Sequence, residues 1–519
     1  MASPQEKLAE SLEKLKELQV ENGIAAIRSK ELSQTHRERL LRNGFIRRVM
    51  KGWYIPTDPS EGPGSSTSWY TSFWGFCAKY LAHRFDNKWC IAPEQSLSYW
   101  VGNRKVPSQL IVRSPKARNK PTTLLHDTSI LDIRAELPSK DEIEQIDGLN
   151  LYSVAFGLIA CSPRFFRNEP IDAKAALEMI RDSSEILRPL LEGGHSTIAG
   201  RIAGAFRNIG RDRIADEIIK TMESAGYEIR ESDPFNRKTD IAKIDRKNSP
   251  YVNRMNLMWE EMREEVEKVF PDSPGIPKNA DKYLKEVEDL FVTDAYHSLS
   301  IEGYRVTSEL IERVRTGDWG PENIEQDREH RNAMAARGYW QAFQPVKACV
   351  KKVLEGKNAG KVVDEDHGNW YRELFAPSVT AGIIKATDLA GYRSDQVWIQ
   401  NSMHVPPRSE AVRDMMPAFF DLLKKEESAS VRVVLGHFIF VYIHPYMDGN
   451  GRMARFLMNV MLASGGYPWT VLPVEERDEY MQSLEEASTS NNISRFAKFI
   501  AHHVEEGMKG NPVAKVQSK

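Results

Sequence analysis

The chain has 519 residues, of which 41% are hydrophobic and 28% charged, so it is long enough for about three globular domains. Its 71 Lys and Arg residues nearly balance its 73 Asp and Glu residues, and the formal net charge is −2. This balance excludes a protein that is basic throughout, as a nucleic-acid coat would be, and an acidic disordered chain. A local basic patch remains compatible with it.

The cysteines and the apolar runs bear on the compartment. Cys77, Cys90, Cys161 and Cys349 include no C-x-x-C pair, which argues against a zinc site or a disulfide framework. Free thiols are typical of a reducing compartment. No stretch reaches the roughly 18 apolar residues of a membrane span, and the first residues lack the apolar core of a signal peptide. The sequence therefore predicts a cytoplasmic protein that makes no contact with a membrane.

Residues 1–58 predict a small domain of helices and a hairpin. Four leucines between positions 8 and 18 recur at spacings of four, three and three, which is one apolar helix face. A short helix is expected near 29–32, a second near 35–43 that stops at Gly44, and a hairpin over 45–54. Helix, turn, helix and hairpin in this order predict a winged helix.

The same region is locally basic. Between Ile24 and Ile55 the chain has eight basic and two acidic residues, a local balance of +6. A DNA phosphate backbone would favour such a surface, but a solvated face or a protein-binding domain would have the same composition. The candidate DNA contacts are Arg28, Arg37, Arg39 and Arg42.

The middle of the chain mixes strands and helices. A loop rich in Pro, Gly and Ser over 56–68 is followed by strand candidates in QLIVRSP, SILDIR and LNLYSV, and 150–228 has helical spacing of apolar residues. Residues 229–250 are charged and contain two prolines, which predicts a linker. The predicted parts of the chain are 1–58, 69–228, the linker 229–250, a third domain over 251–507, and a tail over 508–519.

Helices dominate the third domain, with one expected exception. GYRSDQVWIQNSMHVPP, at 391–407, has the pattern of a β-hairpin. The predicted fold class is therefore a mainly α multidomain protein. Its all-α C-terminal domain would carry one β-hairpin, and a winged helix and an α+β region would precede it.

HPYMDGNGRMAR, which begins at His444, is the most informative stretch. An apolar helix is expected before it and a second helix after it. Gly449 and Gly451 then lie in a loop at a helix N-terminus, where outward N–H groups and the helix dipole favour an anion. Arg452 and Arg455 are three residues apart, share a helix face, and can both reach phosphate oxygens.

Asp448 and His444 complete this constellation. Asp448 supplies a hard oxygen ligand beside the predicted phosphate site, where Mg²⁺ is usually held. His444 lies at the other edge of the loop, where a general base would be needed. A lone histidine is more often structural, and Asp448 could simply cap the following helix. The sequence has no G-x-x-x-x-G-K-[ST] motif, so if ATP is used, this loop must hold it.

The stretch resembles the signature of the Fic (filamentation induced by cAMP) family, with Tyr446 in place of the usual phenylalanine. The resemblance implies a protein adenylyltransferase that uses ATP and Mg²⁺ to transfer AMP to a Ser, Thr or Tyr hydroxyl of a target protein. It implies that His444 is the general base and Asp448 the metal ligand. The helix ERDEYMQSLEEAS resembles the family's adenine-side helix. The implied nucleotide contacts are Gly449, Asn450, Gly451, Arg452, Arg455, Tyr480 and Ser488.

Two more segments extend the resemblance over 251–507. One resembles the family's flap, which aligns a target protein by strand-like pairing, and consists of Val397, Trp398, Ile399, Gln400, Asn401, Ser402 and Met403. The other, Ser298 to Gly303, fits the inhibitory motif Ser/Thr-x-x-x-Glu-Gly/Asn. That motif implies that Glu302 pairs with Arg455 and prevents productive ATP binding. Because Fic relatives often form dimers, a homodimer is expected by analogy.

RSKELSQTHRERLLRNGFIRRVMKGWYIP resembles the N-terminal domain of AbiEi-type antitoxins and transcriptional regulators. The Fic signature and its inhibitory motif imply a toxin-like activity that is held in check in cis by Glu302. Two alternatives stay open. The chain could be an AbiEi-type DNA-binding regulator whose Fic part only senses nucleotide. It could also remove AMP from modified proteins, with Glu302 positioning water.

Overall fold

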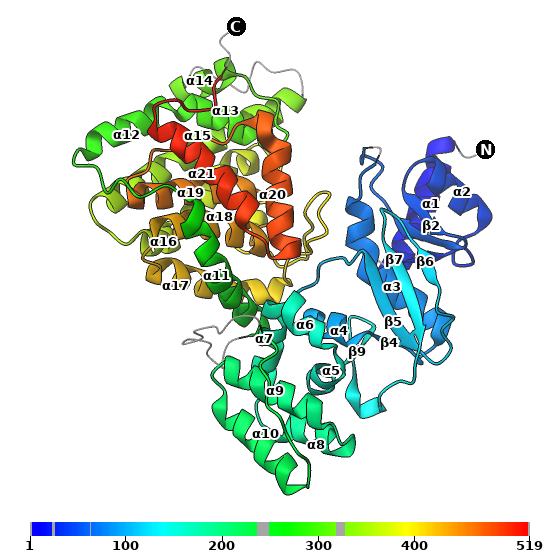
Figure 1. The fold of residues 1–519 in the computed structure, drawn as a ribbon. Helices are drawn as coiled ribbons and strands as arrows, with labels where there is room; N and C mark the ends of the chain where they lie inside the picture. The colour runs from blue at the N-terminus through cyan, green and yellow to red at the C-terminus, as the bar shows by residue number, and fades with distance from the viewer. Residues whose placement is uncertain (1–2, 23–25, 63, 236–248, 318–326, 517–519) are drawn as a thin grey trace. The chain divides into compact units, whose positions relative to one another are not determined.

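The computed structural model describes residues 3–22, 26–62, 64–235, 249–317 and 327–516 (Figure 1). The chain forms two compact units. The N-terminal unit is Met1–Arg254 together with Trp398–Val405, and the C-terminal unit is Met255–Val397 together with Pro406–Lys519. Among the described residues, no helix combines the length and the apolarity that crossing a membrane requires.

The N-terminal unit begins with two helices and a three-stranded antiparallel sheet in the order β1-β3-β2. Leu15, Leu40 and Ile46 share a small core, because their spacing turns them to the inner side of their elements. The predicted second helix and the hairpin are confirmed. The elements are α1 (Pro4–Asn22), β1 (Ile27–Arg28), α2 (Gln34–Arg42), β2 (Ile46–Met50) and β3 (Trp53–Pro56).

The helix expected at 29–32 is absent, because these residues form a turn. The Glu31 side chain accepts a 2.8 Å hydrogen bond from the N–H of Arg28 and closes this turn. A segment of four residues also gains too few helical hydrogen bonds to repay the cost of nucleating a helix.

A second sheet follows, in the order β4-β5-β7-β6, with β5 and β7 parallel. The three strands predicted in this region are confirmed as β5, β7 and β9, whereas the short strands β4, β6 and β8 were not predicted. Trp69 and Phe73 of α3 join the core under this sheet. The elements are α3 (Thr67–Phe85), β4 (Cys90–Ile91), α4 (Pro93–Trp100), β5 (Gln109–Ser114), β6 (Pro121–Thr123), β7 (Ser129–Arg134), β8 (Ile143–Ile146) and β9 (Leu149–Tyr152).

The helical prediction for 150–228 is confirmed by six helices. Part of the predicted linker, 236–248, lies outside the described residues. The helices are α5 (Val154–Ala160), α6 (Pro163–Asn168), α7 (Pro170–Met179), α8 (Ser184–Glu192), α9 (Ser196–Asn208) and α10 (Asp212–Ser224).

The C-terminal unit is helical, and its described residues contain no strand. The most apolar helix, α18, is buried on nearly every side and packs against α19. Gly436 permits this contact, since a Cβ there would lie 3.0 Å from Leu457 of α19. The helices are α11 (Pro250–Val269), α12 (Ala280–Asp289), α13 (Phe291–Ile301), α14 (Ser308–Thr316), α15 (Asp327–Leu354), α16 (Ala359–Thr380), α17 (Ser409–Lys425), α18 (Ala429–Ile443), α19 (Asn450–Gly465), α20 (Arg477–Ser490) and α21 (Ser494–Met508).

The β-hairpin predicted over 391–407 is wrong, because this segment is turn and coil. Its backbone groups bond to other segments and not across a hairpin: Arg393 N–H donates to the Pro445 carbonyl at 2.9 Å. Asn401 N–H donates to the Thr67 hydroxyl at 3.1 Å. Pro406 and Pro407 also carry no N–H for a ladder.

The N-terminal unit contains a buried ion pair that ties α11 to α7. Arg254 Nε donates to Asp172 Oδ1 at 2.8 Å, and the two side chains are only 2% and 0% exposed. Asn103 donates to the other carboxylate oxygen of Asp172 at 2.7 Å. The carboxylate therefore has a donor on each oxygen, as a buried charge requires.

Asp172→Ala should destabilise the protein by about 3–5 kcal/mol, because it leaves a buried guanidinium without its counter-charge. Glu192→Ala is the control, since it removes a carboxylate from the exposed pair with Arg188 and should cost less than about 1 kcal/mol. Urea unfolding followed by tryptophan fluorescence measures both. Equal midpoints for the two variants would contradict a structural role for the buried pair.

Candidate active site

The loop between α18 and α19 is held closed by its own side chains. Asn450 accepts a hydrogen bond from Tyr446 N–H and donates one to the Tyr446 carbonyl, both at 2.9 Å. The Asn450 side chain, which was expected to contact phosphate, is therefore engaged within the loop. Gly449 has φ +80°, and a Cβ there would lie 2.7 Å from the Phe375 ring, so only glycine fits.

Tyr446 anchors the loop from below. Its ring is 1% exposed and stacks on Tyr371, with centroids 3.9 Å apart and an angle of 10° between the rings. Burial raises the pKa of Tyr446, so the phenol stays neutral. Tyrosine thus fills the aromatic position of the sequence motif without adding a charge to the core.

His444 ends α18 in the left-handed conformation, at φ +52°. Burial lowers the pKa of His444 to about 4, although a backbone contact with Val441 opposes this shift. Its Nδ1 lies 3.3 Å from the Val441 carbonyl, which assigns the ring proton to Nδ1. The neutral ring then keeps Nε2 as a proton acceptor at pH 7.

Arg393, which was not among the predicted site residues, holds the end of α18. This guanidinium is 2% exposed and donates to the carbonyls of His444 at 2.8 Å and Asp395 at 3.0 Å. It also donates to the carbonyls of Pro407 and Ile443. A cation at a helix C-terminus is favourable. No motif or spacing marks this arginine, because its acceptors are backbone atoms from three separate segments.

Arg452 is buried between two aromatic rings. Its guanidinium lies 5.2 Å from the centroid of Tyr304 and 4.9 Å from that of Phe375. Within the described residues, its Nε and Nη2 have no hydrogen-bond acceptor, although Nη2 lies 3.4 Å from Asp448 Oδ2. Buried donors without acceptors are costly, so these N–H groups suit an anionic ligand.

The structure brings Arg455 together with the predicted inhibitory residues on α13. Arg455 donates to the Ser298 hydroxyl at 2.8 Å, to the Ser298 carbonyl at 3.0 Å and to Glu302 Oε1 at 2.7 Å. Burial alone would lower the pKa of Arg455, but the Glu302 carboxylate raises it above its ordinary value. Gly303, at φ +83°, follows Glu302 and lets the chain turn away from α13.

Glu302 also lies against the first turn of α19. A Cβ on Gly451 would lie 2.3 Å from Glu302 Oε1 and 3.2 Å from Arg455 Nη1. The carboxylate therefore occupies the place at the helix N-terminus that suits an anion. A side chain at position 451 would displace the Glu302 carboxylate.

Asp448 is the exposed acid of the loop. Its Oδ1 accepts a 2.6 Å hydrogen bond from Gly449 N–H, and its side chain is 62% exposed. In the part of the chain that the structure describes, no three His, Cys, Asp or Glu residues gather as a metal cluster. One accessible carboxylate fits Mg²⁺ that takes its other ligands from nucleotide phosphates and water.

The two predicted adenine contacts lie in the core. Tyr480 and Ser488 are buried on α20, at 2% and 8% exposure. The Tyr480 hydroxyl lies 2.8 Å from Nε2 of His437, and burial raises the pKa of Tyr480 to about 12. His437 is fully buried, as a structural histidine would be. These side chains support α18 and α20 from inside and present no open face to a base.

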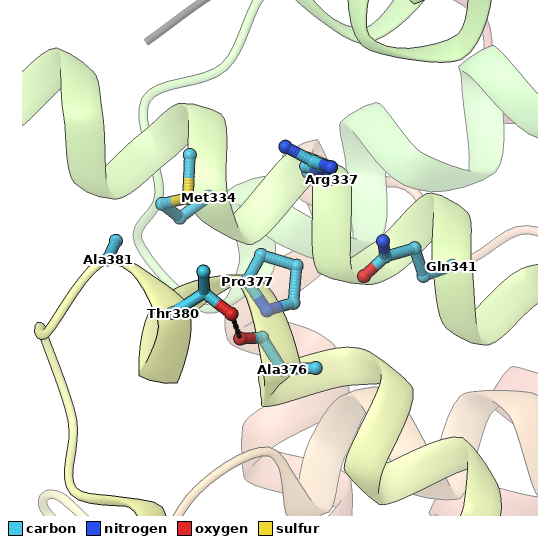
Figure 2. A pocket seen from close by; sticks show the side chains of 7 residues that line it. All are labelled: Met334, Arg337, Gln341, Ala376, Pro377, Thr380 and Ala381. Atoms are coloured by element: carbon cyan, nitrogen blue, oxygen red, sulfur yellow. Dashed lines mark hydrogen bonds between the residues drawn. The ribbon is translucent and has the colours of Figure 1, made fainter.

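Two cavities of the C-terminal unit differ in their relation to the loop. One of about 420 Å³ is lined by Glu302 and Asp448 and by Gly303, Tyr304, Arg305, Arg331 and Asn332. The other, of about 230 Å³, lies between α15 and α16 (Figure 2), and none of its lining residues belongs to the loop or to α13. The first cavity is therefore the candidate site.

Gly451→Ala should destabilise the protein by about 1–3 kcal/mol, because the new methyl group must displace the Glu302 carboxylate. In a Glu302→Gly background the same change should be neutral or stabilising, since alanine costs less entropy than glycine in a helix. Thermal unfolding of the four proteins measures the coupling. An equal cost of Gly451→Ala in both backgrounds would contradict the contact.

Known proteins match this chain in the region that contains the loop between α18 and α19. Residues 367–462 match the family model described as Fic/DOC family. The chain is similar to "Protein adenylyltransferase Fic" of Nematostella vectensis, at 26% identity over 264 residues, covering 49% of this chain and 56% of the relative. It is also similar to the protein of the same name from Drosophila virilis, at 37% identity over 186 residues, covering 31% of this chain and 38% of the relative.

A solved structure described as Fic-1 (aa134 - 508) from C. elegans aligns with 66% of this chain and 97% of that chain, at 18% identity and a TM-score of 0.37. The chain spans about half or less of the length of the two curated relatives. The family match includes the whole loop from His444 to Arg455.

Proposed function

We propose that the protein transfers AMP from ATP, with Mg²⁺, to a Ser, Thr or Tyr hydroxyl of a target protein. The observation that carries the proposal is the loop between α18 and α19. It places a neutral imidazole, an exposed carboxylate and two buried guanidinium groups around one helix N-terminus. The curated relatives named as protein adenylyltransferases support the same reaction class.

In the proposed reaction the target hydroxyl attacks the α-phosphorus of ATP. Nε2 of His444 accepts the hydroxyl proton, an O–P bond forms to the target, and the bond to the β-phosphate oxygen breaks to release pyrophosphate. The backbone at 449–451 and the Arg452 guanidinium bind the phosphates and stabilise the charge that develops on them. Mg²⁺ held by Asp448 would neutralise part of this charge.

Glu302 keeps the activity low in this proposal. Its carboxylate occupies the helix N-terminus and pairs with Arg455, which would otherwise bind the γ-phosphate. A bound triphosphate would meet a negative charge where it needs a positive one. Removal of Glu302 is therefore the direct test of both the site and its control.

Glu302→Gly should raise ATP affinity about tenfold and increase labelling of target proteins from α-labelled ATP. Unit charges ~4 Å apart interact by about 4 kcal/mol at an effective dielectric of about 20, and desolvation offsets most of this energy. Calorimetry and labelling in cell lysate measure the two effects. The double variant Glu302→Gly with Arg455→Ala should lose the gain.

Labelling by Glu302→Gly no stronger than by wild type would show that Glu302 does not inhibit. Loss of an AMP-removing activity in this variant would instead favour the reverse reaction. If neither labelled protein nor free AMP forms, the result would favour a domain that only senses nucleotide.

His444→Ala in the Glu302→Gly background should reduce labelling by about 10²–10⁴-fold and leave ATP binding unchanged, because it removes only the general base.

Since the pKa of His444 is lowered to about 4, the imidazole stays neutral across the physiological range. The labelling activity of the Glu302→Gly variant should therefore not fall through protonation of His444 when the pH is lowered from 8 to 6. Half-maximal activity near pH 6.5, the ordinary imidazole value, would contradict the buried environment.

We infer a winged helix in the N-terminal region from the order of its elements, but DNA binding is not part of the proposal. Three of the four candidate arginines bond within the protein. Arg28 Nε lies 3.2 Å from Glu31, Arg37 donates to the Ser29 carbonyl at 2.7 Å, and Arg39 donates to Ser11 at 2.7 Å. The expected homodimer and the cytoplasmic location stay predictions.

A further inference from the structure

The segment Trp398–Val405, which we call the flap tip, is held at its base by the C-terminal unit. Gln396 donates from Nε2 to the Pro406 carbonyl at 3.0 Å. Arg393 donates to the carbonyls of Pro407 and His444. The chain therefore leaves the C-terminal unit after Val397 and returns to it at Pro406. At this base of the tip, one guanidinium, that of Arg393, binds both the Pro407 and the His444 carbonyl.

The flap tip itself belongs to the N-terminal unit. Asn401 Oδ1 accepts hydrogen bonds from Ser66 N–H at 3.1 Å and from the Ser66 hydroxyl at 3.3 Å. Asn401 N–H donates to Thr67 Oγ1 at 3.1 Å. The Met403 carbonyl accepts a 2.8 Å hydrogen bond from Val106 N–H. Asn401 and Met403, two residues apart in the tip, thus each bond one backbone group to residues 67 and 106 of the N-terminal unit.

Apolar contacts add to these bonds. Val405 is 5% exposed and lies in the same core as Trp69 and Phe73 of α3, and Met403 packs against that core. Burial of such side chains contributes about 1.5–3 kcal/mol each when complete. The hydroxyl-bearing residues Ser65, Ser66 and Thr67 at the start of α3, together with this apolar core, form the surface that receives the tip.

We propose that the N-terminal unit occupies the flap tip in cis and must release it before a target protein can dock. The inference rests on the proposed function and on the expectation from the family resemblance that this segment aligns the target. An added strand would need free N–H and C=O groups at alternate residues of the tip, and the Asn401 N–H and the Met403 carbonyl are already bonded. The partner that fits the released tip is an extended segment of a target that carries a Ser, Thr or Tyr hydroxyl.

The contact can be weakened without changing the flap. Ser66→Ala with Thr67→Val removes two hydroxyls that bond Asn401, and each such bond is modest, so release should be partial. Thr71→Val is the matched control, because its hydroxyl bonds to the Thr67 carbonyl within α3. All variants are made in the Glu302→Gly background, so that nucleotide binding does not limit the reaction.

We expect faster hydrogen exchange at residues 398–405 and about 3- to 10-fold more labelling of added proteins in the release variant. ATP affinity should be unchanged, and the control should match its parent. Faster exchange without more labelling would overturn the proposal. No labelling in any variant, including the parent, would count against AMP transfer itself.

A reversible lock gives the opposite test. Ser66→Cys with Asn401→Cys replaces two side chains in contact, and the four native cysteines are buried, so oxidation should form one new disulfide. The oxidised protein should lose labelling of added proteins, and reduction should restore it in the same sample. Equal labelling before and after reduction, with the disulfide verified by mass spectrometry, would overturn the proposal even if the release variant failed to fold.

Discussion

The ion pair between Glu302 and Arg455 governs the arrangement of the candidate site. Arg455 is 3% exposed, and a guanidinium so far from water needs an anion or several acceptors. Helix α13 supplies them from one face: Ser298 by its hydroxyl and carbonyl, and Glu302 by its carboxylate. Asp294, one turn earlier, is buried near the same cation, and burial raises its pKa to about 6. These bonds use Nε and Nη2, whereas Nη1 has no acceptor among the described residues, so an anion that binds Arg455 would meet Nη1 open and the other two nitrogens already engaged.

The rest of the loop is built for rigidity. Asn450 closes the loop, Tyr446 anchors it on Tyr371, and Arg393 fixes the end of α18 through carbonyl groups. None of these side chains presents an open reactive atom. They keep His444, Asp448 and Arg452 in one geometry, which is the condition under which electrostatic stabilisation costs no reorganisation.

Sequence patterns predicted the elements that depend on residues close together in the chain. The apolar character of α18, the glycines at the start of α19 and the pairing of Glu302 with Arg455 follow from composition, backbone freedom and the family resemblance. The roles of Asn450, Tyr480 and Arg393 depend on which atoms meet in space. An asparagine in a glycine loop reads as a ligand contact, but its amide is used on Tyr446. The hairpin predicted at 391–407 failed for the same reason, because Met403 and Val405 pack with the core of Trp69 and Phe73 and the backbone of the segment bonds to other segments and not across a ladder.

Because Trp398–Val405 belongs to the N-terminal unit, the order in which the ribosome makes the chain affects when that unit can finish folding. The core around α3 includes Val405, which is synthesised only after α11 to α16 have been made. A domain usually folds as soon as its own chain has emerged. Here the first unit stays incomplete until Val405 has been translated, after α16 and before α17. The last part of the N-terminal core is therefore made before α17, α18 and the loop that begins at His444.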